Sequence, residues 1–359
     1  MKIVTVVGAR PQFIKASALS RELLKSPDME EVIIHTGQHF DSNMSDVFFE
    51  EMEIPAPKYQ LDIHSLSHGA MTGRMMEEIE KVLLYERPDV VLVYGDTNST
   101  LAGALAACKL NLKVAHVEAG LRSFNLKMPE EINRILTDRI SDLLFCPTEE
   151  AVSNLNAEGF GQFQSKVVLS GDIMLDAALY YRNKADTESR ILEKHDLKKN
   201  HYVLATIHRQ ENTDDHARLQ SIIDALNELN QKTRVVVPLH PRTRNIIHDS
   251  QILTDFTIIE PVGYFDMISL ISNATLIMTD SGGLQKEAYF FGKYCITLRD
   301  QTEWVELVKG GYNTLTGSDK IKILKAFDEY SVKKLSFDKP LYGDGHAAKI
   351  ILVSLQEIM

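Results

Sequence analysis

VAHVEAGLRSFNLKMPEEINRILTDRISDLLFCPT, residues 114–148, is the stretch from which the fold can be worked out. It opens with an apolar strand, residues 114–117, that delivers Glu118 to its carboxyl end. A loop with a glycine follows, and Pro129 then stands at the first position of a helix whose first turn carries Glu131. The stretch therefore predicts a strand and a helix that aim two carboxylates into the space between them.

The predicted helix has two unlike faces at 100° per residue. The apolar side chains share one sector: Ile132, Ile135, Leu136, Ile140 and Leu143. The charged side chains of Glu131, Arg134 and Asp138 share the opposite side. An ordinary helix with a solvated charged stripe shows the same pattern, so a functional role for Glu131 needs support from elsewhere in the chain.

Length and composition indicate a globular enzyme of two domains. A chain of 359 residues exceeds the size at which a single hydrophobic core usually keeps growing. Its hydrophobic content of 44% and charged content of 25% are ordinary for a globular protein. The formal net charge of −11 argues against binding to nucleic acid or to an anionic membrane surface, so we expect neither as a partner.

The cysteines and the apolar runs predict a cytoplasmic protein. The 3 cysteines have no metal-ligand spacing and stand in apolar or mixed surroundings, as core cysteines of a reducing compartment do. No apolar signal region precedes the first strand, and no run reaches the ~18 apolar residues of a membrane-spanning helix.

Short apolar runs alternate with helical stretches in both halves of the chain. In the first half the predicted strands cover residues 2–7, 31–36, 90–96, 114–117 and 166–172. In the second half they cover residues 202–208, 234–240, 256–261, 275–280 and 294–299. This alternation predicts the α/β class, with one doubly wound, Rossmann-like parallel sheet in each half.

A glycine and a charged segment suggest where the two domains divide. Gly171 ends the last strand of the first half, and residues 182–200 form a polar connection. We expect an N-terminal domain at 1–170, a C-terminal domain at 171–345, and a final helix at 346–359 that packs back on the N-terminal domain.

Strand ends in the first half carry charged residues. The turn after residues 2–7 leads through Gly8 into a helix, and Arg10 and Lys15 add two cations at a place where open α/β sheets bind anions. Asp96 ends another strand; taken alone it is as easily a solvated turn residue, but Glu118 stands at an equivalent position.

Histidines end two strands in the second half. His208 is followed by Arg209 and Glu211, and His240 is followed by Arg242. A single histidine at such a place is more often structural than catalytic, whereas two at neighbouring strand ends with arginines nearby favour a ligand site.

A third strand end in the second half has the composition of a phosphate-binding turn. Ser281 can cap the next helix, and Gly282 and Gly283 would let a phosphate approach free backbone N–H groups. Glu287, about a turn and a half into that helix, could accept both hydroxyls of a ribose. The sequence contains no GxGxxG, GxxxxGK[ST], HExxH or CxxC motif, so hydride transfer, ATP hydrolysis and zinc chemistry lack support.

Two doubly wound domains with charged strand ends predict a ligand in the cleft between them. The glycine turn suits a diphosphate, and the carboxylates Asp96, Glu118 and Glu131 suit acid–base work on the group that the diphosphate carries. Burial of several carboxylates near one another raises the pKa of at least one, so that one can hold a proton while another takes one.

Seven segments together resemble one enzyme family. They are GARPQFIKAS, TGQHFDSNMSDVFFEE, VYGDTNSTLAGALAA, AHVEAGLRSFNLKMPEEINRILTD, IHRQEN, PLHPRT and TDSGGLQKEA. In this order they are similar to the non-hydrolysing UDP-N-acetylglucosamine 2-epimerases. The resemblance implies a GT-B fold and a reaction without metal or cofactor. UDP is eliminated across C1–C2 to leave a bound 2-acetamidoglucal, and is then added back with C2 inverted.

The resemblance also implies roles for individual residues. The catalytic group would comprise Asp96, Glu118, Glu131 and His208. The residues expected to contact the diphosphate or the sugar are Arg10, Lys15, Arg134, Glu211 and His240. Phosphate would rest on Ser281, Gly282 and Gly283, the ribose on Glu287, and the uracil along residues Val262 to Met267.

Two short runs depart from the family pattern. Trp304 stands in Thr-Glu-Trp-Val-Glu where the family usually has Thr-Glu-Arg-Pro-Glu with a substrate-facing arginine. Residues 38–41, Gln-His-Phe-Asp, differ from the Gln-His-Arg run at which some members build an allosteric UDP-N-acetylglucosamine site. Both variants resemble the branch that epimerises UDP-2,3-diacetamido-2,3-dideoxyglucuronate for O-antigen synthesis. UDP-N-acetylglucosamine is the leading expected substrate, and this uronate is the alternative.

Other functions remain open at the level of sequence. A GT-B glycosyltransferase would need an acceptor groove, and a hydrolysing epimerase shares nearly all these residues. A non-catalytic nucleotide-sugar sensor would not need three converging carboxylates. The family also suggests a homodimer and a role in cell-surface polysaccharide synthesis.

Overall fold

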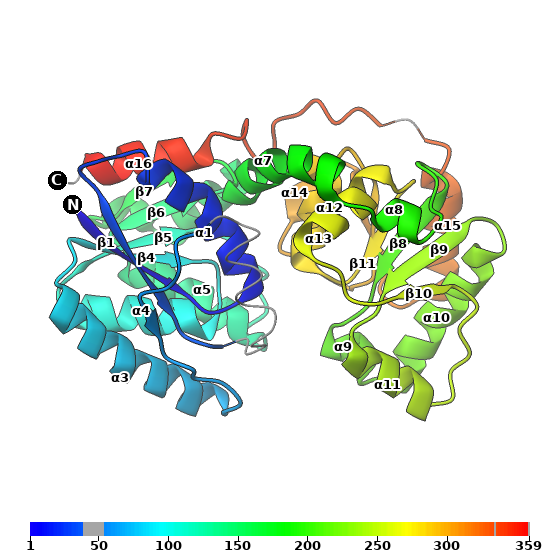
Figure 1. Cartoon of the computed structure of the whole chain (residues 1–359), viewed down its shortest axis with the longest axis horizontal. Coiled ribbons are helices and arrows are strands. Elements are labelled where there is room, and N and C mark those ends of the chain that lie inside the picture. The colour runs from blue at the N-terminus through cyan, green and yellow to red at the C-terminus, as the bar shows by residue number, and fades with distance from the viewer. Residues whose placement is uncertain (39–53, 334, 358–359) are drawn as a thin grey trace. The chain divides into compact units, whose positions relative to one another are not determined.

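Two compact α/β units make up the chain (Figure 1). The structure is a computed structural model that describes residues 1–38, 54–333 and 335–357. Unit 1 comprises Met1–Ala177 with Pro340–Met359, and unit 2 comprises Ala178–Lys339. The unit boundaries thus lie at 177/178 and 339/340, where we expected 170/171 and 345/346.

Unit 1 is built on a seven-stranded sheet of order β3-β2-β1-β4-β5-β6-β7, in which every paired neighbour is parallel. Its strands are β1 Lys2–Val7, β2 Glu30–His35, β3 Tyr59–Gln60, β4 Val90–Tyr94, β5 Lys113–Val117, β6 Leu143–Cys146 and β7 Lys166–Leu169. Its helices are α1 Arg10–Leu23, α3 His68–Glu86, α4 Asn98–Lys109, α5 Pro129–Ile140, α6 Glu149–Ala157, the 3-10 turn η1 Phe160–Gln162 and α16 Ala347–Gln356; α7, Ile173–Glu188, begins in this unit. Valines and isoleucines of the central strands pack against α3 and α4 to form the core.

Unit 2 repeats this plan with a six-stranded parallel sheet of order β10-β9-β8-β11-β12-β13. Its strands are β8 Tyr202–Thr206, β9 Arg234–Pro238, β10 Thr257–Ile259, β11 Ile277–Thr279, β12 Cys295–Thr297 and β13 Asn313–Leu315. Its helices are α8 Ile191–Lys194, α9 Gln210–Thr213, α10 His216–Asn230, α11 Pro241–Asp249, α12 Tyr264–Asn273, α13 Gly282–Phe290, α14 Val305–Lys309 and α15 Lys320–Tyr330. Two buried clusters cover the two faces of the sheet.

The strand order reverses between β1 and β4 in unit 1 and between β8 and β11 in unit 2. Parallel doubly wound sheets bind ligands at the carboxyl ends of the strands at this switch point. The predicted α/β class with doubly wound sheets is confirmed, and the expected site residues at 96, 208 and 281 follow β4, β8 and β11 directly.

Helix α5 is buried on the face opposite to the one that its hydrophobic pattern suggests. Glu131 and Asp138 are 0% exposed and Arg134 is 2% exposed, whereas Ile132 and Leu136 are 43% and 44% exposed. The interpretation of the charged side as a solvated stripe is therefore wrong. The polar side chains find ion pairs and backbone donors in the interior, described below, and these contacts outweigh the apolar pattern of the helix.

The sequence analysis did not predict three of the strands, β3, β6 and β13. Leu143, which we assigned to the apolar face of the preceding helix, begins β6, because the helix ends at Ile140. Strand β3 has two residues, and β13 consists of Asn313, Thr314 and Leu315. Such short or polar strands are recognisable only from their pairing with β2 and β12.

The C-terminal segment belongs to unit 1. Helix α16 lies beside α1, as the red and blue ribbons of Figure 1 show. The Asp176 carboxylate accepts hydrogen bonds from the first two backbone N–H groups of α16, Ala347 at 3.1 Å and Ala348 at 2.8 Å. The Lys166 ammonium forms an ion pair with Glu357 near the other end. These contacts explain why a segment that follows unit 2 in the sequence packs with unit 1.

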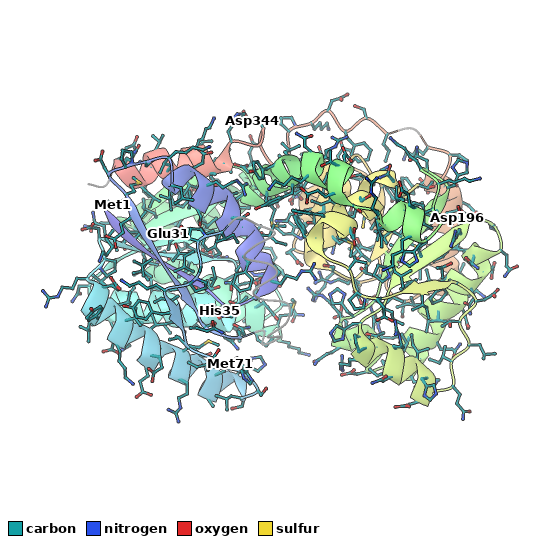
Figure 2. The ribbon with its side chains drawn as sticks, in the orientation of Figure 1. Met1, Glu31, His35, Met71, Asp196 and Asp344 are labelled. Atoms are coloured by element: carbon teal, nitrogen blue, oxygen red, sulfur yellow. The ribbon has the colours of Figure 1, made fainter. Side chains whose placement is uncertain are left out.

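Strand β2 carries a polar side chain near each end, Glu31 and His35, which are labelled in Figure 2. Glu31 accepts a hydrogen bond from the Thr5 hydroxyl at 2.6 Å, and the His35 ring lies 5.0 Å from that of Phe13. Residues 38–41 differ from the run at which some family members build an allosteric site. Of these, residues 39–41 lie outside the described residues. In the described ranges, no helix has both the length and the apolar character needed to span a membrane.

Candidate active site

The β1–α1 and β4–α4 turns of unit 1 are joined through Gln12. Its side-chain oxygen accepts hydrogen bonds from the backbone of Gly8 at 2.8 Å and Ala9 at 3.0 Å. Its amide nitrogen donates to the Tyr94 carbonyl at 2.8 Å. This buried amide fixes the two turns that flank the switch point, and Arg10 begins α1 directly beside it.

Lys15 and Glu118 form a buried ion pair at the carboxyl end of β5. Lys15 is 7% exposed and Glu118 is 8% exposed. Glu118 adopts a φ of 74°, a left-handed conformation that is strained for a residue with a side chain and that clusters at functional sites. A Cβ on Gly95 would lie 3.2 Å from both charged groups, so a glycine at this turn leaves room for the pair.

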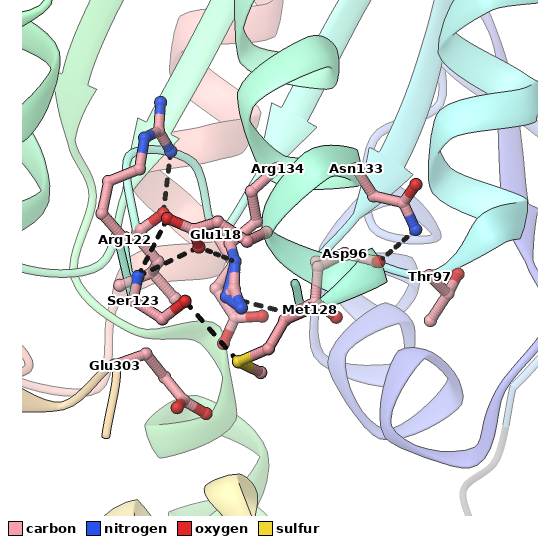
Figure 3. A network of polar contacts seen from close by, with 12 residues as sticks. Asp96, Thr97, Glu118, Arg122, Ser123, Met128, Asn133, Arg134 and Glu303 are labelled. Atoms are coloured by element: carbon pink, nitrogen blue, oxygen red, sulfur yellow. Dashed lines mark hydrogen bonds and ion pairs between the residues drawn. The ribbon is translucent and has the colours of Figure 1, made fainter. Parts of the chain in front are cut away.

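Asp96 lies near this pair, and two residues of α5 contact it. The Arg134 guanidinium is 3.4 Å from the Asp96 carboxylate, and the Asn133 side chain donates to the Asp96 carbonyl at 2.9 Å, as Figure 3 shows for Asn133. Desolvation raises the pKa of Asp96; the charges of Arg134 and Lys15 oppose this effect, and that of Glu118 adds to it. A carboxyl with a raised pKa is suited to proton transfer.

Glu131 is occupied by backbone donors. The Ser123 N–H donates to its two oxygens at 3.1 and 3.0 Å, and the Phe124 N–H donates to one of them at 2.8 Å. The Arg134 guanidinium lies 3.3 Å away. Glu131 thereby fastens the loop before α5 to the first turn of that helix.

In unit 2, His208 follows β8 and lies against Asp280, which follows β11. Asp280 is 0% exposed and accepts hydrogen bonds from the backbone of His208 and Arg209 and from the Asn212 side chain. The His208 ring, half exposed, lies 3.2 Å from the same carboxylate. Asp280 thus holds the loop that carries His208 next to the turn that carries Ser281.

Ser281 caps α13 by accepting a hydrogen bond from the Leu284 N–H at 3.4 Å. A Cβ on Gly282 would lie 2.5 Å from the Glu303 carboxylate, so a larger residue at this helix start would require the Glu303 side chain to move. Among the described residues, apart from its chain neighbours and the backbone of α13, no atom lies within 4 Å of the corresponding position on Gly283. The two glycines and the helix N-terminus form the type of turn that binds phosphate.

Other predicted residues of unit 2 have defined local positions. Glu211 is half exposed, with its carboxylate 3.7 Å from the Arg299 guanidinium, and Glu287 is buried in α13. The His240 ring caps α11 by accepting a hydrogen bond from the Arg242 N–H at 3.2 Å, which is a structural role. Val262 and Met267 flank the start of α12 and pack against its hydrophobic cluster.

Trp304, at the position that departs from the family pattern, is 4% exposed. The Lys286 ammonium lies 4.1 Å from the centroid of its ring, a cation–π contact. A Cβ on Gly282 would be 3.7 Å from the indole nitrogen, so Trp304 lies beside the phosphate-type turn.

The predicted residues are thus brought together in two groups, one in each unit. Lys15, Glu118, Asp96, Arg134 and Glu131 are linked in unit 1, and His208 and Ser281 are linked through Asp280 in unit 2. Sequence reasoning missed Gln12, Asn133 and Asp280, which hold the predicted residues in place. A buried amide or carboxylate of this kind has no recognisable spacing in the sequence. Among the described residues, no group of three or more His, Cys, Asp or Glu side chains is arranged to hold a metal ion.

Paired carboxylates with cations in one unit and a phosphate-type turn in the other define an α/β enzyme of the doubly wound class, equipped for acid–base chemistry. A family model described as UDP-N-acetylglucosamine 2-epimerase matches residues 21–356. The chain therefore belongs to the UDP-N-acetylglucosamine 2-epimerase family, whose members are UDP-sugar 2-epimerases and hence isomerases. The resemblance stated from the sequence motifs is confirmed.

Relatives of known function cover the whole chain. The UDP-2,3-diacetamido-2,3-dideoxy-D-glucuronate 2-epimerase of Pseudomonas aeruginosa is 53% identical over 359 residues, 100% of each chain. The UDP-N-acetylglucosamine 2-epimerase of Methanocaldococcus jannaschii is 44% identical over 98% of each chain.

Solved structures show the same fold. A structure of the M. jannaschii UDP-GlcNAc 2-epimerase in complex with UDP-GlcNAc and UDP aligns with a TM-score of 0.91 at 43% identity, covering 99% of this chain and 100% of that one. The Neisseria meningitidis UDP-GlcNAc 2-epimerase bound to UDP-GlcNAc aligns with a TM-score of 0.90 at 34% identity, with the same coverage.

Proposed function

We propose that this protein interconverts UDP-N-acetylglucosamine and UDP-N-acetylmannosamine by eliminating UDP and adding it back. The observation that carries the proposal is the pair of carboxylates at the ends of neighbouring strands, Asp96 after β4 and Glu118 after β5. Desolvation raises the pKa of Asp96, whereas Glu118 is paired with the Lys15 ammonium. Two carboxyl groups in unlike environments can divide acid and base roles.

The proton steps follow from this division. Glu118, whose ion pair favours the carboxylate, takes the C2 proton while the C1–O bond breaks and its electron pair leaves with UDP. A 2-acetamidoglucal remains in the site. On the return, the phosphate oxygen of UDP reforms the bond to C1, and Asp96 delivers a proton to the other face of C2. The net change is inversion at C2.

Departure of the diphosphate requires positive charge and hydrogen-bond donors, because the C2 proton is only weakly acidic. We assign the diphosphate to Arg10, His208 and the turn Ser281–Gly283, and the ribose to Glu287. The helix N-terminus at Gly282 supports this assignment, since oriented N–H groups stabilise a developing anion without reorganisation.

Glu131 receives a different role from the one that the resemblance implies. Its two oxygens already accept three backbone hydrogen bonds from Ser123 and Phe124. A carboxylate engaged in this way is a poor proton carrier, and we assign it the anchoring of the loop that leads into α5.

A second candidate substrate, UDP-2,3-diacetamido-2,3-dideoxyglucuronate, is favoured by a specific observation. The P. aeruginosa enzyme named for that sugar is 53% identical over the full length of both chains. Trp304 also replaces the arginine that we expect beside the sugar. Both sugars carry the 2-acetamido group, so the elimination steps above apply to either.

An equilibration assay tests the function and decides between the sugars. The protein is incubated separately with UDP-N-acetylglucosamine and with the diacetamido-uronate nucleotide, and the products are followed by anion-exchange chromatography and 1H NMR. The proposal predicts that UDP-N-acetylmannosamine accumulates to a constant ratio with no net release of UDP. If the protein epimerises the diacetamido-uronate nucleotide and not UDP-N-acetylglucosamine, the uronate is its substrate. Irreversible release of UDP would indicate a hydrolysing enzyme and would contradict it.

We further propose that the protein acts in the cytoplasm as a homodimer and supplies sugars for cell-surface polysaccharides. This setting is supported by the family to which the chain belongs. Light scattering after size-exclusion chromatography checks the dimer, for which the expected mass is twice the 40.5 kDa of one chain; a mass of one chain at micromolar concentration would contradict it.

A further inference from the structure

A network of four ionisable side chains, of which His116, Arg122 and Asp138 are buried and Glu158 is exposed, lies beneath the Gly95–Asp96 turn of unit 1. His116, on β5, and Asp138, on α5, are both 0% exposed. Arg122, in the loop between these elements, is 2% exposed, and Glu158 caps the end of α6. The mechanism proposed above uses none of them.

Both ring nitrogens of His116 face hydrogen-bond acceptors. Nδ1 lies 2.7 Å from the Asp138 carboxylate, and Nε2 lies 2.7 Å from the backbone carbonyl of Gly95. A neutral imidazole has one N–H, so it would direct a lone pair at one of these oxygens. With Asp138 as a carboxylate, both contacts are satisfied only when both ring nitrogens carry a proton.

The surrounding charges balance an imidazolium at this position. Asp138 also accepts hydrogen bonds from the Gly120 N–H at 3.1 Å and from Arg122 at 2.7 Å. Arg122 donates in turn to both oxygens of Glu158, at 2.6 and 2.8 Å. Burial acts to raise the pKa of Asp138, but the hydrogen bond and charge of His116 and the charge of Arg122 bring its pKa below the usual value. Two cations and two carboxylates then make the network neutral.

One further titratable group lies against the network. Burial raises the pKa of the Cys146 thiol on β6, and the neighbouring Asp138 charge adds to this effect. Cys146 is therefore a neutral thiol and leaves the charge balance unchanged.

The turn that the imidazolium holds is the one that carries Asp96. The Gly95 N–H donates to the Val117 carbonyl at 2.9 Å, while the Gly95 carbonyl accepts from His116. Both ends of this residue are thus tied to β5, the strand that also ends in Glu118. The spacing between the two proposed proton carriers depends on these two bonds.

We propose that His116 is a positioning residue, an imidazolium with both ring nitrogens protonated that fixes the Gly95–Asp96 turn relative to Glu118. The inference rests on the proposed function for its effect on catalysis. The protonation of the ring is a property of the folded chain and can be measured without substrate.

The first test is a long-range 1H–15N NMR spectrum of histidine-labelled protein at pH 7.5, without nucleotide. The His116 signal is assigned by its loss in His116→Gln. The expected result is two protonated ring nitrogens for His116 in the wild type, and a neutral ring in Asp138→Asn. A wild-type ring with one unprotonated nitrogen overturns the proposal, and this result does not depend on whether the protein is an epimerase. If His116→Gln does not fold, the signal is assigned instead from triple-resonance spectra of the wild type.

The second test is steady-state kinetics of His116→Gln and Asp138→Asn, with His248→Gln as the control at an exposed histidine on α11. Displacement of a proton carrier lowers kcat by about 100-fold. We expect this loss in the first two variants with KM within about threefold of the wild type, and no change in the control. A kcat near the wild-type value in either variant overturns the positioning role. Absence of 2-epimerisation in the wild type would instead contradict the proposed function and leave the NMR result standing.

Discussion

Glu118 is the residue on which the proposed chemistry depends most, because it combines a left-handed φ of 74° with a buried ion pair to Lys15. We predict that Glu118→Gln lowers kcat by roughly 10²- to 10⁴-fold, the range for loss of a positioned base. The affinity for UDP, measured by calorimetry, should stay within about threefold because the assigned diphosphate residues are unchanged.

Glu130→Gln is the matched control for that variant. Glu130 stands in the first turn of α5 and is exposed, and its charge adds only weakly to the raised pKa of Asp96. Its replacement should therefore leave UDP affinity unchanged and kcat within about twofold of the wild type. Equal losses of catalysis and UDP binding in Glu118→Gln would show that Glu118 is a binding or folding residue.

Arg134 tunes the proton affinity of Asp96. Desolvation raises the pKa of Asp96 and the Arg134 charge, 3.4 Å away, opposes it. Removal of that charge in Arg134→Met should therefore raise the pKa further, and the limb of the kcat–pH profile that reports Asp96 should move to higher pH. Arg134→Lys keeps the charge and should move the limb less. A shift to lower pH, or equal profiles for both variants, would exclude this role.

The candidate site residues stand at strand ends where polar residues interrupt apolar runs, and sequence reasoning selected them for that reason. Asp96, Glu118, His208 and Ser281 were recognised in this way. His116 was not, since a single histidine inside an apolar strand carries no local signal. The proposed role of His116 follows from its contacts with Asp138 and Gly95, which the fold places beside its two ring nitrogens.

Among the elements, the turn after β4 is the most constrained. Gly95 has a φ of 64°, and a side chain here would crowd Lys15 and Glu118. We predict that Gly95→Ala destabilises unit 1 by about 1 kcal/mol through backbone strain and also abolishes turnover. Unfolding by urea and the equilibration assay measure the two effects.

Gly292→Ala provides the comparison for backbone strain alone. Gly292 has a φ of 65°, but among the described residues beyond its chain neighbours a Cβ there would meet Phe337 alone, at an ordinary contact distance of 3.8 Å. It should lose similar stability and keep its activity. If Gly95→Ala were as active as Gly292→Ala, the crowding argument would fail.

Helix α3 ends in a carboxylate that joins three elements. Glu86 accepts hydrogen bonds from Tyr59 on β3 and Lys2 on β1 and pairs with Lys58. The Lys58 and Tyr59 hydrogen bonds lower the pKa of Glu86 from 4.5 to about 2. Its stabilising contribution is therefore complete above the unfolded pKa of 4.5 and is lost as the pH falls toward 2.

Urea unfolding of the wild type and Glu86→Gln between pH 7 and pH 3 checks this dependence. The difference in unfolding free energy between the two proteins should be largest at pH 7 and should shrink steadily below pH 4.5. A difference that is constant over this range would show that Glu86 stabilises the fold by packing rather than by charge.

The elements themselves show where sequence patterns mislead. The 3.6-residue periodicity of α5 predicted the helix, but the alternative of a solvated charged stripe is wrong because Arg134 and Asp138 are buried and paired with partners distant in sequence. Hydrophobic periodicity predicts the buried face of a helix because burying an unpaired charge is costly. The prediction fails where the fold places an oppositely charged partner beside each buried charge.

At the scale of the whole molecule, strand–helix alternation was sufficient to predict two doubly wound units. The C-terminal segment was less accessible, since its place in unit 1 depends on the Asp176 carboxylate at the start of α16 and on the Glu357–Lys166 pair at its end. Relatives that cover 98% to 100% of the chain are named for two different UDP-sugars, and the equilibration assay distinguishes these two substrates.

Deuterium exchange at C2 tests the central claim most directly. The protein is incubated with UDP-N-acetylglucosamine in D2O, and separately with the diacetamido-uronate nucleotide, and the C2 proton signal is followed by 1H NMR. Elimination and re-addition predict that deuterium replaces the C2 proton in both the starting sugar and its 2-epimer, while the total UDP-sugar concentration stays constant. An unexchanged C2 proton in both nucleotides after prolonged incubation with folded, UDP-binding protein would contradict the account.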